Sequence, residues 1–145
     1  MNRKYLPTFA ELVDRLSIVQ LKSIFISSNK SAYDLEAADI VHDLDVIIKE
    51  KGIRLTGAMV RAILVTMLTN RYIWENESKA RLGGSEQDKL LKLTHSINGV
   101  RNTAKNIISK ELGERIDLKI DALAAELTAE FGNWNIWSTD TSRPV

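Results

Sequence analysis

The stretch KLLKLTHSINGVRNTAKNIISKELG, from Lys89 to Gly113, decides the predicted fold. Its apolar residues recur at intervals of three and four, which places them on one face of an α-helix. They are Leu90, Leu93, Ile97, Val100, Ala104 and Ile107. A helix with one apolar face needs a partner that buries it, so this stretch predicts a long helix inside a bundle.

A polar stripe runs beside the apolar face of the same helix. It consists of His95, Asn98, Arg101, Asn102 and Lys105, which recur at helical spacing and share one flank. The stripe is rich in hydrogen-bond donors and contains no carboxylate, so it suits an anionic or polar ligand. The alternative is that these side chains hydrogen-bond neighbouring helices, as buried polar groups usually do.

Composition limits the classes of protein that the chain can belong to. With 145 residues, 44% of them hydrophobic, it fits one domain with a real core. The formal net charge of +1 gives no bulk basic field, which disfavours nucleic acid as a partner. The absence of cysteine excludes disulfides, thiolate metal sites and a cysteine nucleophile.

The first residues, MNRKYLPTFAEL, reach an acidic residue without an apolar signal core, so we expect a cytoplasmic protein. The most apolar run, Ala62 to Leu68, is far too short to cross a bilayer. We therefore expect no membrane segment.

Capping residues and apolar periodicity predict the other helices. The first helix is expected over Phe9 to Ile26, with Thr8 and Glu11 as its capping box. The second is capped by Ser31 with Asp34 and ends at Gly52, and the third is capped by Thr56 and ends before Gly83 and Gly84. A fifth helix is expected over Glu114 to Phe131. Ser85 with Asp88 is the expected cap of the central helix, and Gly113 is its expected end.

Two of these helices have apolar positions that define their expected inner faces. The face of the second helix is Ala37, Ile40, Val41, Leu44, Ile47 and Ile48, and that of the third is Val60, Ile63, Leu64 and Met67. The chain shows no alternating strand pattern, so we predict an all-α bundle of four to five helices. Short loops make the third and fourth helices a long central antiparallel hairpin. The bundle is expected over residues 1–132, and an irregular tail with Trp134 and Trp137 over residues 133–145.

The hairpin predicts a ligand pocket, because polar flanks of several helices would meet beside it. Positive side chains would bind a phosphate, amides would add neutral hydrogen bonds, and an indole would stack on a planar base. The predicted ligand-binding residues are Arg15, Lys22, Asn70, Trp74, Glu77, Arg81, His95, Asn98, Arg101 and Lys105, with Asp14 and Ser17 as further polar groups of the first helix.

Three blocks of the sequence resemble a family of short, helical, uncharacterised bacterial and phage proteins. The first block, Glu11 to Leu16, is similar to Glu-Leu-Ile-Asp-Lys-Leu. The second is similar to an Asn followed by Leu-Trp-x-x-Glu and an Arg, and here it consists of Asn70, Ile73, Trp74, Glu77 and Arg81. The third is similar to His-x-x-Asn-x-x-Arg-x-x-x-Lys, and here it consists of His95, Asn98, Arg101 and Lys105, followed by Leu112 and Gly113. The resemblance covers about Thr8 to Gly113 and implies a fold without an activity. It departs from the family at Gly99, where members carry an acid, and in the C-terminal segment.

The residues give little support to an enzymatic function. His42 with Asp43 forms a His-Asp doublet of the kind that metal phosphohydrolases use, but no histidine precedes it to complete the site, and His95 is the only other histidine in the chain. Acid pairs such as Glu11 with Asp14, and Glu36 with Asp39, have a spacing used by magnesium-dependent nucleotide hydrolases. Caps and solvated faces explain both pairs, and the expected pocket is basic.

We therefore predict a protein that binds a small phosphorylated or nucleotide-like ligand without turning it over, uses no cofactor and forms a homo-oligomer. In a phage it could sequester a host signalling nucleotide. One alternative is an interaction or scaffold protein whose polar stripe sets the register of an oligomer. The other is a magnesium-dependent nucleotide hydrolase.

Overall fold

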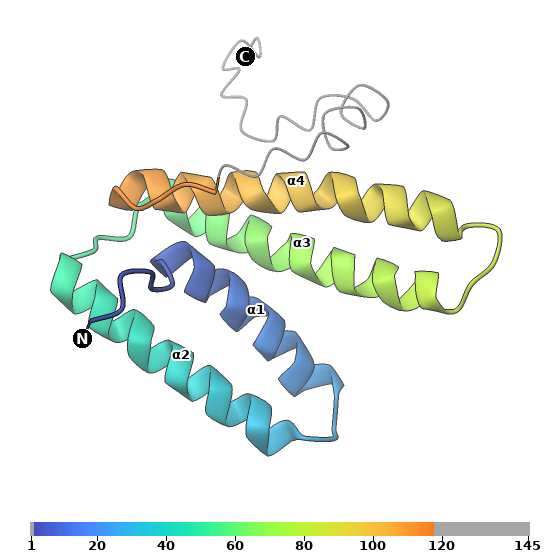
Figure 1. The fold of residues 1–145 in the computed structure, drawn as a ribbon, viewed down its shortest axis with the longest axis horizontal. Helices are drawn as coiled ribbons and strands as arrows, with labels where there is room; N and C mark the ends of the chain where they lie inside the picture. Colours follow the sequence, from blue (N-terminus) through green and yellow to red (C-terminus); the bar gives the residue numbers. More distant parts are fainter. Residues whose placement is uncertain (1, 118–145) are drawn as a thin grey trace, which may run out of the picture.

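The computed structural model describes residues 2–117, and its secondary structure consists of helices. These are α1 (Phe9–Phe25), α2 (Lys30–Lys51), α3 (Gly57–Arg81) and α4 (Gln87–Leu112). Within this part of the chain no strand occurs, so the predicted all-α bundle is confirmed. Figure 1 shows the helices as two hairpins, α1 with α2 and α3 with α4.

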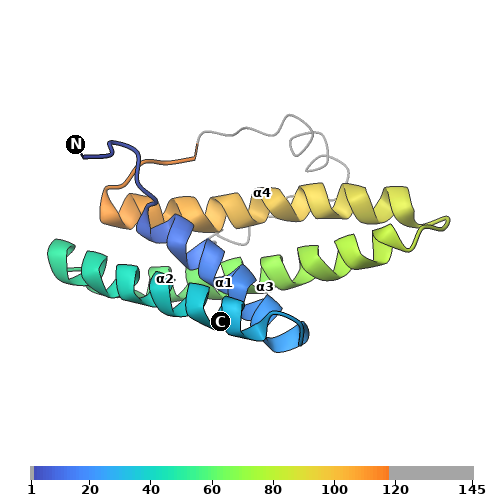
Figure 2. The same cartoon turned by 60° about the horizontal axis from the view of Figure 1, so that its bottom comes forward.

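The two longest helices form the predicted antiparallel hairpin. α3 and α4 lie side by side along most of their length in Figures 1 and 2. Between them Gly83 and Gly84 have φ of 75° and 111°, a left-handed region that glycine adopts without a steric penalty. These two glycines therefore allow the chain to reverse direction over a few residues.

α1 is the element that joins the two hairpins. It packs against α2, α3 and α4, whereas α2 packs against α1 alone among the described helices. The shared core contains the fully buried Val19 of α1, Met59 of α3 and Ile108 of α4. Side chains that project from α1 toward α3 and α4 therefore lie where three helices meet.

Several predicted helix ends are confirmed in detail. Thr8 and Glu11 form a reciprocal capping box, and Thr56 accepts a hydrogen bond from the backbone of Met59. Gly52 and Gly113 end α2 and α4 in the left-handed conformation, as expected of C-terminal glycines.

The caps predicted from Ser31 and Ser85 are wrong. α2 begins one residue before Ser31, after Asn29, whose φ is 62°. Asp34, the expected partner of Ser31, instead accepts hydrogen bonds from Lys30 and Ser23. α4 begins after Glu86, and no side-chain hydrogen bond caps it. In both places a backbone turn begins the helix.

The inner face predicted for α3 is also partly wrong. Val60 and Leu64 are 41% and 58% exposed, and the buried positions include Ala62, Thr66 and Thr69. The threonine hydroxyls bind backbone oxygens of their own helix, with Thr66 Oγ1 2.9 Å from the carbonyl oxygen of Ala62. Small, internally satisfied side chains can thus line a close contact with α4, and the larger aliphatic groups turn outward. On α2, similarly, Val41 and Ile48 are exposed, because that helix meets only α1.

The segment after α4 starts differently from the prediction. Glu114 to Asp117, expected to begin a fifth helix, are not helical, and residues 118–131 of that helix lie outside the described part of the chain, as does the predicted tail. The Glu114 carboxylate accepts from the backbone N–H of Phe9 at 3.0 Å and from Lys51 Nζ at 2.6 Å. It therefore links the end of α4 to the start of α1 and the end of α2.

Candidate functional site

A polar cluster occupies the place where α1, α3 and α4 meet. Its centre is Asn70, which is 3% exposed. The Asn70 amide nitrogen donates to Asp14 Oδ1 at 2.7 Å and to Ser17 Oγ at 2.6 Å. Its amide oxygen accepts from Arg101 Nη1 at 3.0 Å. One amide therefore connects three helices.

The hydrogen-bond partners determine how the Asn70 amide must be oriented. Arg101 can only donate, so it requires the amide oxygen, and the Asp14 carboxylate accepts, so it requires the amide nitrogen. Ser17 donates its hydroxyl proton to the backbone oxygen of Asp14 at 2.8 Å, which leaves its oxygen free to accept from Asn70. Every bond in the cluster is consistent with this single orientation.

A second cation completes the cluster. Lys105 Nζ lies 3.4 Å from Asp14 Oδ2, and the two side chains are 14% and 15% exposed. Asp14, Arg101 and Lys105 together carry one negative and two positive charges at neutral pH. The cluster therefore has an excess of positive charge where water has little access, and an anion can compensate it.

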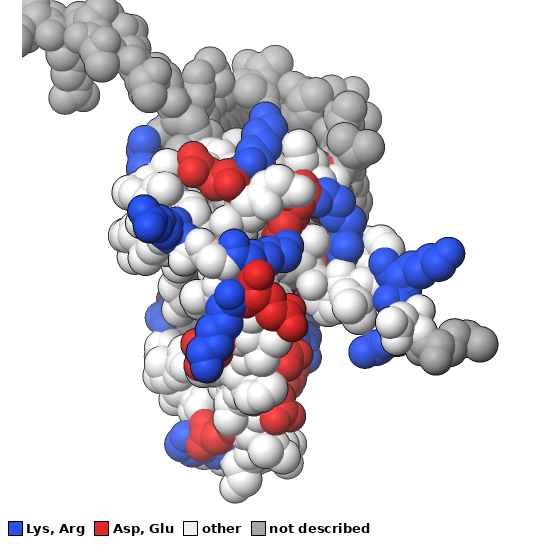
Figure 3. All heavy atoms as spheres, turned by 90° about the vertical axis from the view of Figure 1, so that its left-hand side faces the viewer, with Lys and Arg blue, Asp and Glu red and all other residues white. Residues whose placement is uncertain are grey.

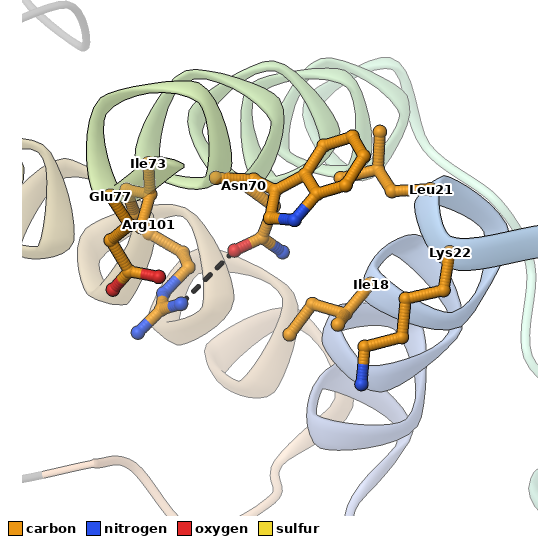
Figure 4. A pocket seen from close by; sticks show the side chains of 8 residues that line it. Ile18, Leu21, Lys22, Asn70, Ile73, Glu77 and Arg101 are labelled. Carbon is orange, nitrogen blue, oxygen red and sulfur yellow. Dashed lines mark hydrogen bonds between the residues drawn. The ribbon is translucent and has the colours of Figure 1, made fainter. Parts of the chain in front are cut away.

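A cavity of about 230 Å³ opens beside the cluster. It is lined by Ile18, Leu21, Lys22, Asn70, Ile73, Trp74, Glu77 and Arg101, side chains from α1, α3 and α4. Figure 4 shows Arg101 and Glu77 on one side of the cavity and Lys22 on the other, with Asn70 between them. The wall is therefore mostly apolar and carries charged groups at two ends.

One donor of the cluster lacks a partner. Arg101 Nε is buried and makes no hydrogen bond, although Nη1 of the same guanidinium is held by Asn70. A buried donor without an acceptor costs about 1–3 kcal/mol. Arg101, a residue that lines the cavity, therefore keeps one buried donor without an acceptor.

The structure brings together six of the ten predicted ligand-binding residues. Asn70, Arg101 and Lys105 belong to the polar cluster, and Lys22, Trp74 and Glu77 line the cavity with Asn70 and Arg101. Trp74 also packs against Phe25, with 5.4 Å between the ring centroids.

The other four predicted residues lie elsewhere. Arg15 is exposed and donates to Glu36 of α2 at 2.7 Å. Arg81 lines a second cavity, more open to solvent, near the α3–α4 turn. His95 is exposed on α4, and Asn98 is half-buried outside both the cluster and the cavity. Helical spacing correctly predicts which residues share one side of a helix, but one side of a helix extends well beyond a single site.

Sequence reasoning missed the apolar wall of the cavity. Ile18, Leu21 and Ile73 look like ordinary core positions, and nothing in their spacing sets them apart. Asp14 and Ser17 carried a usable signal, because they interrupt the apolar pattern of α1. As predicted for further polar groups of the first helix, both contact Asn70, and Asp14 also faces Lys105.

Metal-binding groups, helix hydropathy and surface charge are three further features of residues 2–117 that bear on function. No group of three or more histidine, aspartate or glutamate side chains lies close enough there to hold a metal ion. None of the four helices is long and apolar enough to cross a membrane. Figure 3 shows one end of the bundle, where basic and acidic side chains are interspersed and form no large patch of like charge.

Comparisons of the chain with protein-family models, with curated proteins and with solved structures found no match. The likeness to short bacterial and phage proteins therefore stays a prediction. Any inference about function has to come from the chemistry of the polar cluster and its cavity.

Proposed function

We propose that the protein binds a small anionic ligand with a planar apolar group, such as a phosphorylated or nucleotide-like compound, and does not transform it. The observation that carries the proposal is Arg101, held by Asn70 at the wall of a cavity also lined by Trp74. This arrangement combines a fixed cation with an aromatic surface.

The charged end of the cavity suits an oxyanion. Asn70 occupies Nη1 of Arg101, and the unpartnered Nε belongs to the other edge of the guanidinium, which pairs with two oxygens of a phosphate or carboxylate. Lys22 adds a second positive charge, and Glu77 opposes it with one negative charge. The charged lining therefore has a net charge of about +1 at neutral pH.

The apolar end and the volume limit the size of the ligand. Ile18, Leu21, Ile73 and Trp74 form a wall on which a ring can pack. A cavity of about 230 Å³ is below the usual range of roughly 300–1,000 Å³ for drug-sized ligands. We therefore infer one ring system with one anionic group, and a dinucleotide would extend into solvent.

The lining also supports binding rather than turnover. Glu77 is the one carboxylate among the described residues that line the cavity, and no histidine or hydroxyl nucleophile lies with it. General acid–base or nucleophilic catalysis needs a second positioned group. Tight binding needs only the donors and the aromatic surface that are present.

Calorimetric titration and thermal shift can test the proposal. The panel contains inorganic phosphate, nucleosides, nucleoside monophosphates, cyclic nucleotides and aromatic carboxylates, and mass spectrometry checks whether the recovered ligand is intact. A ligand at 100 times its Kd should raise the free energy of unfolding by about 2.7 kcal/mol. Stabilisation by ring-bearing anions, without chemical change, is expected.

The structure dictates which variants to use. Replacing Arg101 or Lys105 would also break the polar cluster, so loss of binding would be confounded by loss of stability. Lys22→Ala and Trp74→Leu change the cavity without removing a bond of the cluster, and each should weaken binding at least tenfold. Lys92→Ala, at an exposed position of α4 outside the cavity, is the control. No stabilisation by any compound would overturn the proposal, as would equal binding by all three variants.

A second candidate function follows from the cluster itself. Buried polar groups can serve to fix the register of packed helices, and Asn70 joins α1, α3 and α4 without any ligand. In that case the protein is a helical interaction module, and the cavity is a packing defect. The titration distinguishes the two functions, because only a binding site loses affinity in Lys22→Ala.

A further inference from the structure

The outward face of α3 carries a continuous row of large apolar side chains. Val60, Leu64, Leu68 and Tyr72 follow one another at intervals of four residues and are 41%, 58%, 67% and 41% exposed. Residues four apart lie above one another on a helix. We call these four residues the outer stripe of α3.

The outer stripe is not covered by any described helix. α3 packs against α4 and, beside Asn70, against α1, and its backbone does not approach that of α2. Phe25, at the end of α1, is also 52% exposed. The guanidinium of Arg71, the residue before Tyr72, lies 4.2 Å from the centroid of its ring.

Isolated exposed apolar residues are common on protein surfaces, but a contiguous row of them marks an interaction site. We propose that the partner is a second copy of this chain, packed antiparallel along α3 about a two-fold axis at Leu68. Leu68 then contacts the partner's Leu68, and Leu64 packs on the partner's Tyr72. An isologous contact requires such self-complementarity.

The charges that flank the outer stripe match this arrangement. Arg61 lies seven residues before Leu68, and Glu75 lies seven residues after it, so both are on the same face of α3. About the two-fold axis, Arg61 therefore faces the partner's Glu75, and the pair occurs twice. The Glu75 side chain is 42% exposed and lies 2.6 Å from the Arg71 guanidinium, and a carboxylate can accept from a second arginine.

A parallel arrangement of two copies would lose this complementarity. Parallel helices in register would place Arg61 beside the partner's Arg61, and Glu75 beside the partner's Glu75. Like charges in contact disfavour an interface. The charge pattern therefore selects the antiparallel pairing.

The size of the surface sets the expected affinity. From Val60 to Tyr72 the outer stripe extends over about 18 Å of helix, at 1.5 Å per residue. Such a contact is at the low end of stable interfaces, which bury roughly 1,200–2,000 Å². We therefore expect a dimer with a Kd in the micromolar range, formed and broken as the concentration changes.

Sedimentation equilibrium of the full chain tests the proposal. Protein concentrations from about 1 to about 300 µM bracket the Kd expected for so small an interface. The molecular mass should rise from one chain toward two over this range. Leu68→Asp should stay monomeric throughout, because it places two carboxylates at the axis. The matched control is Leu35→Asp: Leu35 is 65% exposed but lies on α2, so this variant should dimerise normally.

A charge exchange tests the register. Arg61→Glu and Glu75→Arg should each weaken the dimer about tenfold, because each creates two repulsive pairs. An equimolar mixture of the two variants should associate as the wild type does, since a heterodimer restores both opposite-charge pairs. Circular dichroism confirms that all variants remain helical.

Three results would overturn the proposal. The first is a monomeric wild type at every concentration, which would mean that something other than a second copy, such as the C-terminal segment, covers the outer stripe. The second is an equal loss of dimer in Leu35→Asp and Leu68→Asp, which would place the contact elsewhere. The third is failure of the mixed charge variants to associate, which would exclude the antiparallel register.

Discussion

The amide nitrogen of Asn70 on α3 lies 2.7 Å from the carboxylate of Asp14 on α1, although 56 residues separate them in the chain. The same amide accepts a hydrogen bond from Arg101 of α4. A shift of α1 by one turn, about 5.4 Å, would break the first bond and leave Asp14 buried beside apolar groups. This contact therefore specifies how the α1–α2 hairpin sits on the α3–α4 hairpin.

Replacing Asn70 should destabilise the protein more than the loss of one small side chain would suggest. In Asn70→Ala, Asp14 and Arg101 each lose a partner inside the bundle, and leaving buried polar groups unpaired costs about 1–3 kcal/mol. We expect the free energy of unfolding, measured by urea titration, to fall by about 2–3 kcal/mol. The control is Asn98→Ala, which removes the same group outside the cluster and should change stability by about 0.5 kcal/mol or less. Equal effects of the two variants would contradict a central role for Asn70.

The ion pair of Asp14 with Lys105 should contribute more than a surface pair. Both side chains are about 15% exposed, and exposed pairs are typically worth 0.2–1 kcal/mol. We expect a coupling energy of about 1–1.5 kcal/mol from a double-mutant cycle of Asp14→Asn and Lys105→Met, which preserve most of the side-chain volume. The exposed pair of Arg15 with Glu36 provides the comparison and should show a smaller coupling. A coupling near zero for Asp14 with Lys105 would mean that water screens the cluster.

The fold followed from features that act locally along the chain. Apolar periodicity, the capping box at Thr8 and the glycines at positions 83, 84 and 113 are short-range signals, and each predicted its element. The inner face of α3 was harder to predict, because Thr66 and Thr69 become suitable for burial only through hydrogen bonds to their own helix. Hydrophobicity alone ranks Leu64 and Leu68 above them.

The candidate site was predictable only in part, for a related reason. Polar spacing on α3 and α4 pointed to Asn70 and Arg101, which do meet. The distance between His95 and the cavity depends on how two helices rotate against each other, and spacing within one helix carries no information on that rotation. The apolar lining residues Ile18 and Ile73 are indistinguishable in sequence from core residues.

Glu114 should be important for stability despite its place beyond the last described helix. Its side chain is 5% exposed and accepts from the backbone N–H of Phe9 and from Lys51. Glu114→Gln removes the charge from both interactions and should lower the free energy of unfolding by about 1–2 kcal/mol, since hydrogen bonds to charged groups are worth about 1.5–3 kcal/mol. Urea titration measures the loss. Glu111→Gln, at an exposed position of α4, is the control, and a similar loss there would show a general charge effect instead.

The interaction of Asp34 with Lys30 should appear in the pH dependence of stability. Hydrogen bonds from Lys30 and then from Ser23 hold the pKa of the Asp34 carboxyl below its ordinary value of 3.8. A group with a lowered pKa in the folded state stabilises the protein above its unfolded pKa, and this stabilisation is lost as the pH falls through the folded pKa. The difference in Tm between the wild type and Asp34→Asn should therefore be constant above about pH 5 and shrink below about pH 4.

Because the pair of Lys30 with Asp34 is exposed on α2, high salt should reduce the difference in Tm at neutral pH. A difference that persists unchanged to about pH 2 would show that the charge of Asp34 does not stabilise the fold.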